Sequence, residues 1–216
     1  MIVDLSQEIS PEMQVYPGYP SATIVPWNKH DTHGFVTEAI FHITHIGTHV
    51  DAPFHFDPTG MKVHQIPPAK LIADGLVLNL THKGPKDLIT VRDVEKAEEA
   101  ARRPMQTGDI VLLQTGWEEH LGKPEYISSY PGISRECAEY LVSKKIGAVG
   151  LDTPSADHPD DVAFPAHKTL LSNGVLIIEN LVNLSRIGVR RFKFIGLPLK
   201  IHNSSGSPIR AVALIE

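Results

Sequence analysis

Short apolar runs broken by glycine and proline recur along the whole chain and predict more β-strands than helices. Runs of this length are typical of strands at the edge or in the middle of a sheet. A loop is expected at residues 16–20, where two prolines bracket Gly18. Strands are expected at residues 2–5, 22–27, 35–43, 76–80, 109–114, 148–151, 175–178, 192–197 and 209–215.

Three segments in the middle and C-terminal parts of the chain carry helix start or stop signals. Thr90 and Asp93 have the spacing of a capping box, in which each side chain bonds to the backbone of the other residue. Ser134 can cap a second helix, and Gly174 is placed to end a third helix in the left-handed conformation. The predicted helices are residues 91–103, 135–145 and 165–172.

These elements predict the α/β or α+β fold class. Strands outnumber helices, which predicts a mixed β-sheet, open or closed into a barrel, with flanking helices. A chain of 216 residues suits a single domain over residues 1–216. Such a chain can bury roughly 70% of its unfolded surface and needs no disulfide to hold its core.

Composition and charge narrow the classes of function. Apolar residues make up 42% and charged residues 21%, which is ordinary for a globular protein. The net charge is −5 and no basic patch is found, which argues against a nucleic-acid partner. No apolar run reaches the ~18 residues of a membrane span, and no secretory signal follows Met1, so a cytoplasmic protein is expected. The single cysteine, Cys137, fits that reducing compartment.

Histidines are concentrated in one segment of the chain. Five of the 12 histidines lie between His42 and His64. The central run, residues 45–56, reads His-Ile-Gly-Thr-His-Val-Asp-Ala-Pro-Phe-His-Phe, and its weak helix formers and Pro53 disfavour a helix. In an extended chain, side chains of one parity point to one side, and the ionisable residues here are all odd-numbered: His45, His49, Asp51 and His55.

Strand geometry limits how these side chains can meet. Positions four apart on a straight strand are roughly 13 Å apart, so the chain has to bend between His45 and His49, and Gly47 permits that bend. Two imidazoles and a carboxylate suit zinc or manganese and leave positions open for water or substrate. His55, beyond Pro53, could face the metal as a neutral acid or base. A lone histidine is more often a core or surface residue, but burying four ionisable groups unpaired would be costly.

The same segment resembles a known family. The pattern His-x-Gly-Thr-His-x-Asp-x-Pro-x-His-Phe, complete from His45 to Phe56, is similar to the cyclase-like metal-dependent hydrolases, which include bacterial kynurenine formamidase and isatin hydrolase. The resemblance implies a swivelling β/β/α-like fold, a small-molecule substrate and a homo-oligomer, either a dimer or a tetramer. Supporting matches over nearly the whole chain begin at Asp4, Tyr16, Gly108, Thr115, Gly150, Glu179, Pro198 and Ser207.

The resemblance also implies a set of metal ligands. His45, His49 and Asp51 would bind a first ion, and Asp51 would bridge to a second ion held by His167 and Glu179. One or two zinc ions are expected, with manganese as an alternative. The sequence alone makes Glu179 plausible as a metal ligand, because a carboxylate that ends the apolar strand 175–178 needs a partner.

By the same resemblance, His55 would be the catalytic acid and base, and activated water would hydrolyse an amide-type C–N bond. The leading substrate is an aryl formamide such as N-formylkynurenine. Aromatic residues of the N-terminal third could wall a flat pocket, although each is equally a candidate for the core. Residues 28–34, with His30 and His33, are either a lid or a solvent-facing loop. The aromatic residues are Tyr16, Tyr19, Trp27, Phe35 and Phe41.

Other functions remain open at this point. The enzyme could open a cyclic amide, an imide or a lactone, or it could act as a cyclase or dehydratase on a polyketide-like substrate. A catalytically silent metal-binding protein is also conceivable, but the presence of His55 beside all the expected ligands argues against it. Residues 200–206, with an additional His202, depart from the pattern expected of formamidases, which bears on the pocket rather than on the ligands.

Overall fold

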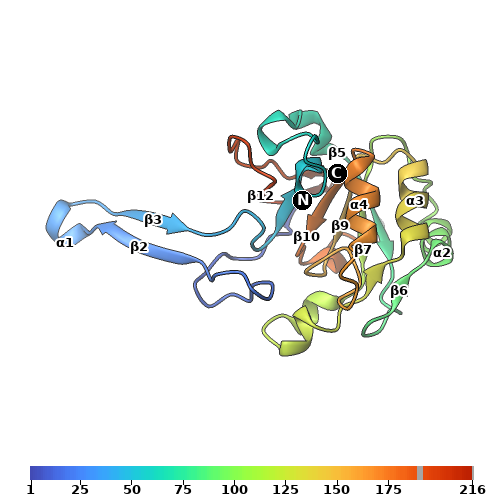
Figure 1. The fold of residues 1–216 in the computed structure, drawn as a ribbon, viewed down its shortest axis with the longest axis horizontal. Coiled ribbons are helices and arrows are strands. Elements are labelled where there is room, and N and C mark those ends of the chain that lie inside the picture. The colour runs from blue at the N-terminus through green and yellow to red at the C-terminus, as the bar shows by residue number, and fades with distance from the viewer. Residues whose placement is uncertain (189–191, 216) are drawn as a thin grey trace.

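A computed structural model describes residues 1–188 and 192–215 of the chain. Nine strands form one mixed sheet, which confirms the predicted α/β class (Figure 1). They are β1 (Ile2–Asp4), β4 (His49–Asp51), β5 (Ile72–Asn79), β7 (Ile110–Gln114), β9 (Ala148–Leu151), β10 (Leu176–Glu179), β11 (Phe192–Ile195), β12 (Gly206–Pro208) and β13 (Val212–Ile215). Their order across the sheet is β1-β13-β11-β5-β7-β9-β10-β4-β12.

Four adjacent strands, β5, β7, β9 and β10, run parallel in the middle of the sheet. Parallel neighbours need crossover connections, and these carry α2 (Val91–Ala101), α3 (Arg135–Ser143) and α4 (Pro165–Ser172). The three helices cover one face of the sheet (Figure 1). Their apolar sides share one core with strand residues such as Leu78, Leu113 and Leu151.

The sheet curls, so that its opposite face encloses a second core. Antiparallel strands extend it on both sides, with β11, β13 and β1 beyond β5, and β4 and β12 beyond β10. Val3, Val50, Ile110 and Phe194 belong to this second core. In the described part of the chain β1 and β12 end the sheet without pairing to each other, so the sheet is half a barrel rather than a closed one.

The helix signals of the sequence are confirmed. Thr90 and Asp93 form the capping box of α2, and the Ser134 hydroxyl accepts the backbone N–H of Cys137 at the start of α3. Gly174, just after α4, has a left-handed φ of +74°. Two ends differ from the prediction: α2 stops before residue 103 because Arg102 turns left-handed, and α3 stops before residue 145.

Strand ends differ more from the prediction than strand positions do. β5 begins at Ile72 rather than at residue 76, because this end pairs with β11. The predicted strand 209–215 is divided, with Ile209 in an isolated bridge to Pro198 and β13 starting at Val212. Strand β12 was not predicted, since its short polar run carries no strand pattern. A small parallel sheet of β6 (Leu88–Ile89) and β8 (Gly132–Ile133) was also missed.

A long hairpin leaves the body of the protein. β2 (Thr23–Asn28) and β3 (Thr37–Phe41) pair antiparallel on either side of α1 (His30–His33), and they project away from the large sheet (Figure 1). We call residues 23–41 the arm. Its apolar side chains lie open on both faces: Trp27 is 74% exposed, Ile40 61% and Phe41 64%.

Loops complete the described chain. They contain short 3₁₀ helices at Pro53–His55, Val63–Gln65, Pro68–Lys70, Trp117–His120, Pro124–Ile127 and Leu184–Arg186. No helix within residues 1–188 or 192–215 is both long enough and apolar enough to cross a membrane.

Candidate metal centre

Strand β4 carries two of the predicted ligands, His49 and Asp51, on one face of the sheet, as their parity predicted. β4 pairs with β10 on one side and with β12 on the other. The register places Glu179 of β10 directly opposite His49. The three side chains therefore share the face that α4 covers, at the carboxyl end of β10, and all three are buried.

His45 reaches the same point from the loop before β4. The chain bends at Gly47, which has a φ of +55°. His45 Nδ1 lies 2.6 Å from Asp51 Oδ1, and its Nε2 lies 2.9 Å from Ser205 Oγ. A Cβ built on Gly206 would lie 2.5 Å from His45 Cε1, so the ring occupies the space of the missing side chain. Sequence reasoning missed Ser205 and Gly206, because serine and glycine are too common in loops to signal a site.

His167 comes from the first turn of α4 and completes the group. Its Nε2 lies 3.4 Å from Asp51 Oδ2 and 3.2 Å from Glu179 Oε1. His49 Nε2 lies 3.4 Å from Asp51 Oδ1 and 3.4 Å from Glu179 Oε2. The structure thus brings together all five residues expected to be ligands, and their metal binding stays a prediction. We call His45, His49, Asp51, His167 and Glu179 the cluster.

Two observations test whether the cluster suits a metal ion. Among the described residues, Asp51 Oδ2 is a buried atom without a hydrogen-bond partner, a state that commonly marks an absent ion or water. Ligand atoms also converge in threes: those of His49, Asp51 and Glu179 lie within 4.8 Å of one another, and so do those of His45, Asp51 and His55. Imidazole nitrogens and carboxylate oxygens are ligands of zinc and related divalent metals, so the residues fit such an ion.

The charges of the cluster also favour a cation. Burial alone would raise the pKa of Asp51, but the neighbouring imidazoles, His45 first, outweigh burial and hold that pKa well below its usual value. Burial alone would lower the pKa of His49, but its contacts with the Asp51 and Glu179 carboxylates raise that pKa to about 10. The carboxylates therefore draw positive charge to His49 Nε2. A metal ion would replace this proton, since imidazole binds metals only in its neutral form.

His55 lies on the 3₁₀ turn Pro53–His55, beyond β4, so the assumption that it continues an extended segment was wrong. The turn nevertheless directs the ring towards the cluster, where it stacks on His45 with 4.0 Å between ring centroids. Burial lowers the pKa of His55 to about 4, which leaves the ring neutral near pH 7. A neutral imidazole at this place can accept a proton.

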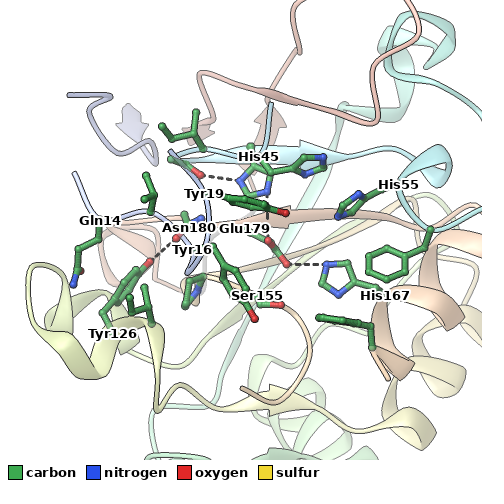
Figure 2. Close-up of a pocket in the computed structure, with 18 residues that line it drawn as sticks. Gln14, Tyr16, Tyr19, His45, His55, Tyr126, Ser155, His167, Glu179 and Asn180 are labelled. Carbon is green, nitrogen blue, oxygen red and sulfur yellow. Dashed lines mark hydrogen bonds and ion pairs between the residues drawn. The ribbon is translucent and has the colours of Figure 1, made fainter. Parts of the chain in front are cut away.

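A pocket of about 270 Å³ opens beside the cluster (Figure 2). His45, His55 and His167 lie at one end, and Tyr126 donates a hydrogen bond to Asn180 Oδ1 at the other. No lysine or arginine is found among the described residues that line the pocket. Walls of this kind suit a small, flat ring. The aromatic lining residues are Tyr16, Tyr19, Phe56, Tyr126 and Phe164.

The predicted aromatic wall is confirmed in part. Tyr16 and Tyr19 line the pocket, whereas the other three residues considered lie exposed on or beside the hairpin strands: Trp27, Phe35 and Phe41. The possible lid, residues 28–34, is the tip of the arm, which projects away from the large sheet (Figure 1), and none of these residues lines the pocket. The additional His202 lies at the surface, with 5.0 Å between its ring centroid and that of His64, and it does not line the pocket.

Comparison with known proteins shows which family has this arrangement. The Cyclase family model matches residues 3–158, which is more than half of the chain. This chain belongs to the cyclase family. The matched residues include the whole segment from His45 to Phe56, whereas His167 and Glu179 lie beyond them.

Named relatives extend the likeness over nearly all of this cyclase-family chain. A kynurenine formamidase from Bacillus thuringiensis subsp. konkukian (strain 97-27) is 31% identical over 214 residues, covering 97% of this chain and 95% of the relative. An isatin hydrolase bound to the product analogue thioisatinate has a TM-score of 0.90 and 28% identity, and the match covers 99% of this chain and 92% of that protein. A predicted metal-dependent hydrolase from Bacillus stearothermophilus has a TM-score of 0.80 and 28% identity, and the match covers 99% of this chain and 97% of that protein. The chain is therefore an enzyme, a metal-dependent amidohydrolase.

Proposed function

We propose that this enzyme hydrolyses an aryl formamide, with N-formylkynurenine as the leading substrate. The observation that carries the proposal is the cluster of three imidazoles and two carboxylates, four of the five residues buried, at one end of an aromatic pocket (Figure 2). The likeness to a kynurenine formamidase over nearly the full length of both chains supports this substrate.

The cluster would hold a divalent metal, with zinc as the first choice and manganese as the alternative. His45, His49 and Asp51 would bind one ion, and Asp51 with His167 and Glu179 would bind a second one. When bound, the metal supplies a Lewis acid and lowers the pKa of bound water towards neutrality.

The remaining chemistry belongs to His55 and the pocket walls. The neutral ring of His55 would take a proton from the attacking water and pass it to the leaving amine nitrogen, which releases formate and the free amine. Tyr16, Tyr19 and Phe164 would hold the aryl ring through aromatic contacts. A protein nucleophile is not needed, and Cys137 is buried in the helix-covered core.

A cyclic amide is the second candidate substrate, and the charge of the pocket favours it. N-formylkynurenine carries a carboxylate, and the described lining residues offer it no lysine or arginine. Isatin is a neutral bicyclic ring and needs no such partner, and an isatin hydrolase shares the fold of this chain. Both substrates would use the same cluster and the same His55.

Removal of the metal is expected to abolish turnover, because the metal would supply the Lewis acid and lower the pKa of the attacking water. The test combines elemental analysis of the purified protein with assays for N-formylkynurenine and isatin before and after chelation. We expect bound zinc or manganese, and hydrolysis that stops on chelation and returns when the metal is restored.

The outcomes of this test separate the candidates. Turnover of isatin alone would replace the leading substrate by the second. Bound metal without turnover of either compound would reject both substrates while keeping the metal centre. A protein that takes up no metal after supplementation would contradict the metal centre itself.

We further propose that the protein works as a homo-oligomer, a dimer or a tetramer, joined through the arm. A two-stranded hairpin alone in water is at best marginally stable, and this one has apolar residues on both faces. Val25 and Phe41 lie on one face, and Ile24 and Ile40 face each other on the opposite one. A second copy of the chain that covers both faces would remove this apolar surface from water.

Replacing Trp27 and Phe41 together by serine is expected to shift the protein towards the monomer, because it removes the two most exposed large hydrophobic side chains of the arm. Sedimentation analysis of wild type and variant measures the change in mass. Leu199→Ser is the matched control, because Leu199 is 64% exposed and lies outside residues 23–41, and this variant should keep the wild-type mass. A monomeric wild type, or an unchanged mass in the arm variant, contradicts this assembly.

The cytoplasm remains the proposed compartment. Cys137 is the single cysteine of the sequence and it lies buried without a disulfide, which requires no oxidising environment.

A further inference from the structure

Asp157 is a buried carboxylate that connects the loop after β9 to the first turn of α4. Its Oδ2 lies 2.6 Å from His167 Nδ1. The same side chain accepts two backbone hydrogen bonds, from Ala166 N to Oδ1 at 2.6 Å and from His167 N to Oδ2 at 3.1 Å. Asp157 does not line the pocket, so its contact with the cluster runs through the His167 ring.

The place of Asp157 at the start of a helix makes it an acceptor of hydrogen bonds. α4 begins at Pro165, so Ala166 and His167 offer the first free N–H groups of the helix. A carboxylate there satisfies both groups and faces the positive end of the helix dipole. Both oxygens of Asp157 already accept backbone N–H groups, so the side chain acts as an acceptor and the hydrogen of the 2.6 Å contact is assigned to His167 Nδ1.

With its hydrogen on Nδ1, the His167 ring can offer a metal only the lone pair of Nε2, and this atom faces Asp51 Oδ2 and Glu179 Oε1. We propose that Asp157 is a positioning residue, which fixes His167 in the tautomer and orientation that bind a metal through Nε2. The inference rests on the proposed metal centre. Partners of this kind typically change metal affinity about 10–100-fold when they are removed.

His49 shows that the arrangement is repeated on the other side of the cluster. Its Nδ1 lies 2.8 Å from the Gly47 carbonyl oxygen, and its Nε2 faces the two carboxylates. Both buried imidazoles therefore have Nδ1 occupied by an acceptor and Nε2 directed to the same space. A backbone carbonyl cannot be removed by substitution, which makes Asp157 the partner to test.

Asp157→Asn is the first experiment. Asparagine keeps the size of the side chain and an oxygen for the helix N–H groups, but an amide NH₂ beside Nδ1 would favour the hydrogen on Nε2. Zinc affinity is measured by competition with a chelating dye, and circular dichroism checks the fold. We expect an affinity loss of about 10–100-fold in the variant.

Asp152→Asn is the matched control. Asp152 is equally buried, follows the same strand β9 and accepts hydrogen bonds from Thr115 and Gly116, while its described partners include no histidine. This variant should keep the zinc affinity of the wild type. Equal affinity of wild type and Asp157→Asn would overturn the inference, and so would an equal loss in the control.

A double substitution tests whether Asp157 acts through His167. His167→Gln should lower zinc affinity, and adding Asp157→Asn to it should cost nothing further, because the ring that Asp157 orients is gone. A loss from Asp157→Asn that is the same with and without His167 would overturn the inference.

The tautomer of His167 can also be measured in the zinc-loaded wild type, so this test does not depend on an Asp157 variant that folds. Imidazole ¹⁵N spectra should show His167 with hydrogen on Nδ1 and zinc on Nε2, the signals being identified by their loss in His167→Gln. An Nδ1 without hydrogen would overturn the inference. Failure of the proposed function looks different, since the wild type itself would then bind no zinc or hydrolyse neither substrate.

Discussion

Asp51→Asn is expected to abolish both metal binding and turnover. The Asp51 carboxylate lies within 3.4 Å of ring nitrogens of His45, His49 and His167, and no other side chain of the cluster contacts all three. The substitution removes a ligand oxygen and its negative charge. Zinc affinity should therefore fall more than the about 10–100-fold that a partner outside the ligand set contributes. Elemental analysis and kcat/KM measure the two losses.

Asp109→Asn is the control for this substitution. Asp109 is also a buried carboxylate, but it lies at the amino end of β7 and pairs with Arg103. Its replacement should lower stability without changing the zinc content. An Asp51→Asn variant that binds zinc like the wild type would show that Asp51 is no ligand.

His55→Ala is expected to lower kcat about 10²- to 10⁴-fold, the usual contribution of a general acid or base. The zinc content should stay that of the wild type, because the proposed ligands remain. The physical reason is that burial lowers the pKa of His55 and keeps its ring uncharged, so that one ring nitrogen can accept a proton. Steady-state kinetics with saturating zinc, together with elemental analysis, measure both quantities.

The competing role for His55 is that of a ligand, because its nitrogen lies within 4.8 Å of ligand atoms of His45 and Asp51. Loss of zinc from His55→Ala would establish that role and remove the acid–base assignment. His82→Ala is the control, since His82 is an exposed histidine that contacts Asp93 instead of the cluster. It should retain both zinc and turnover.

Features decided by neighbouring residues could be predicted from the sequence. The capping box of Thr90 and Asp93, the left-handed Gly174 and the bend at Gly47 each follow from the local chemistry of one or two residues. The shared side of His49 and Asp51 follows from strand alternation alone. His55 marks the limit of that reasoning, because Pro53 begins a turn in which alternation no longer holds.

Features decided by distant residues could not be predicted in this way. The place of Glu179 opposite His49 depends on the pairing of β10 with β4, and no pattern within either strand specifies its partner. Gly206 matters because the His45 ring lies against it, and Asp157 matters because α4 begins beside it. The family resemblance supplied His167 and Glu179, whereas periodicity supplied neither.

The pairing of distant strands also determines when the catalytic site can form during synthesis. Strand β1 pairs with β13, and β4 lies between β10 and β12. A ribosome delivers the N-terminus first, at about 5–20 residues per second. The histidine-rich segment around β4 therefore emerges well before either strand that encloses it. A nascent chain that ends before residue 206 contains the histidines of this segment but lacks strand β12, which pairs with β4. Metal loading therefore has to follow the synthesis of nearly the whole polypeptide.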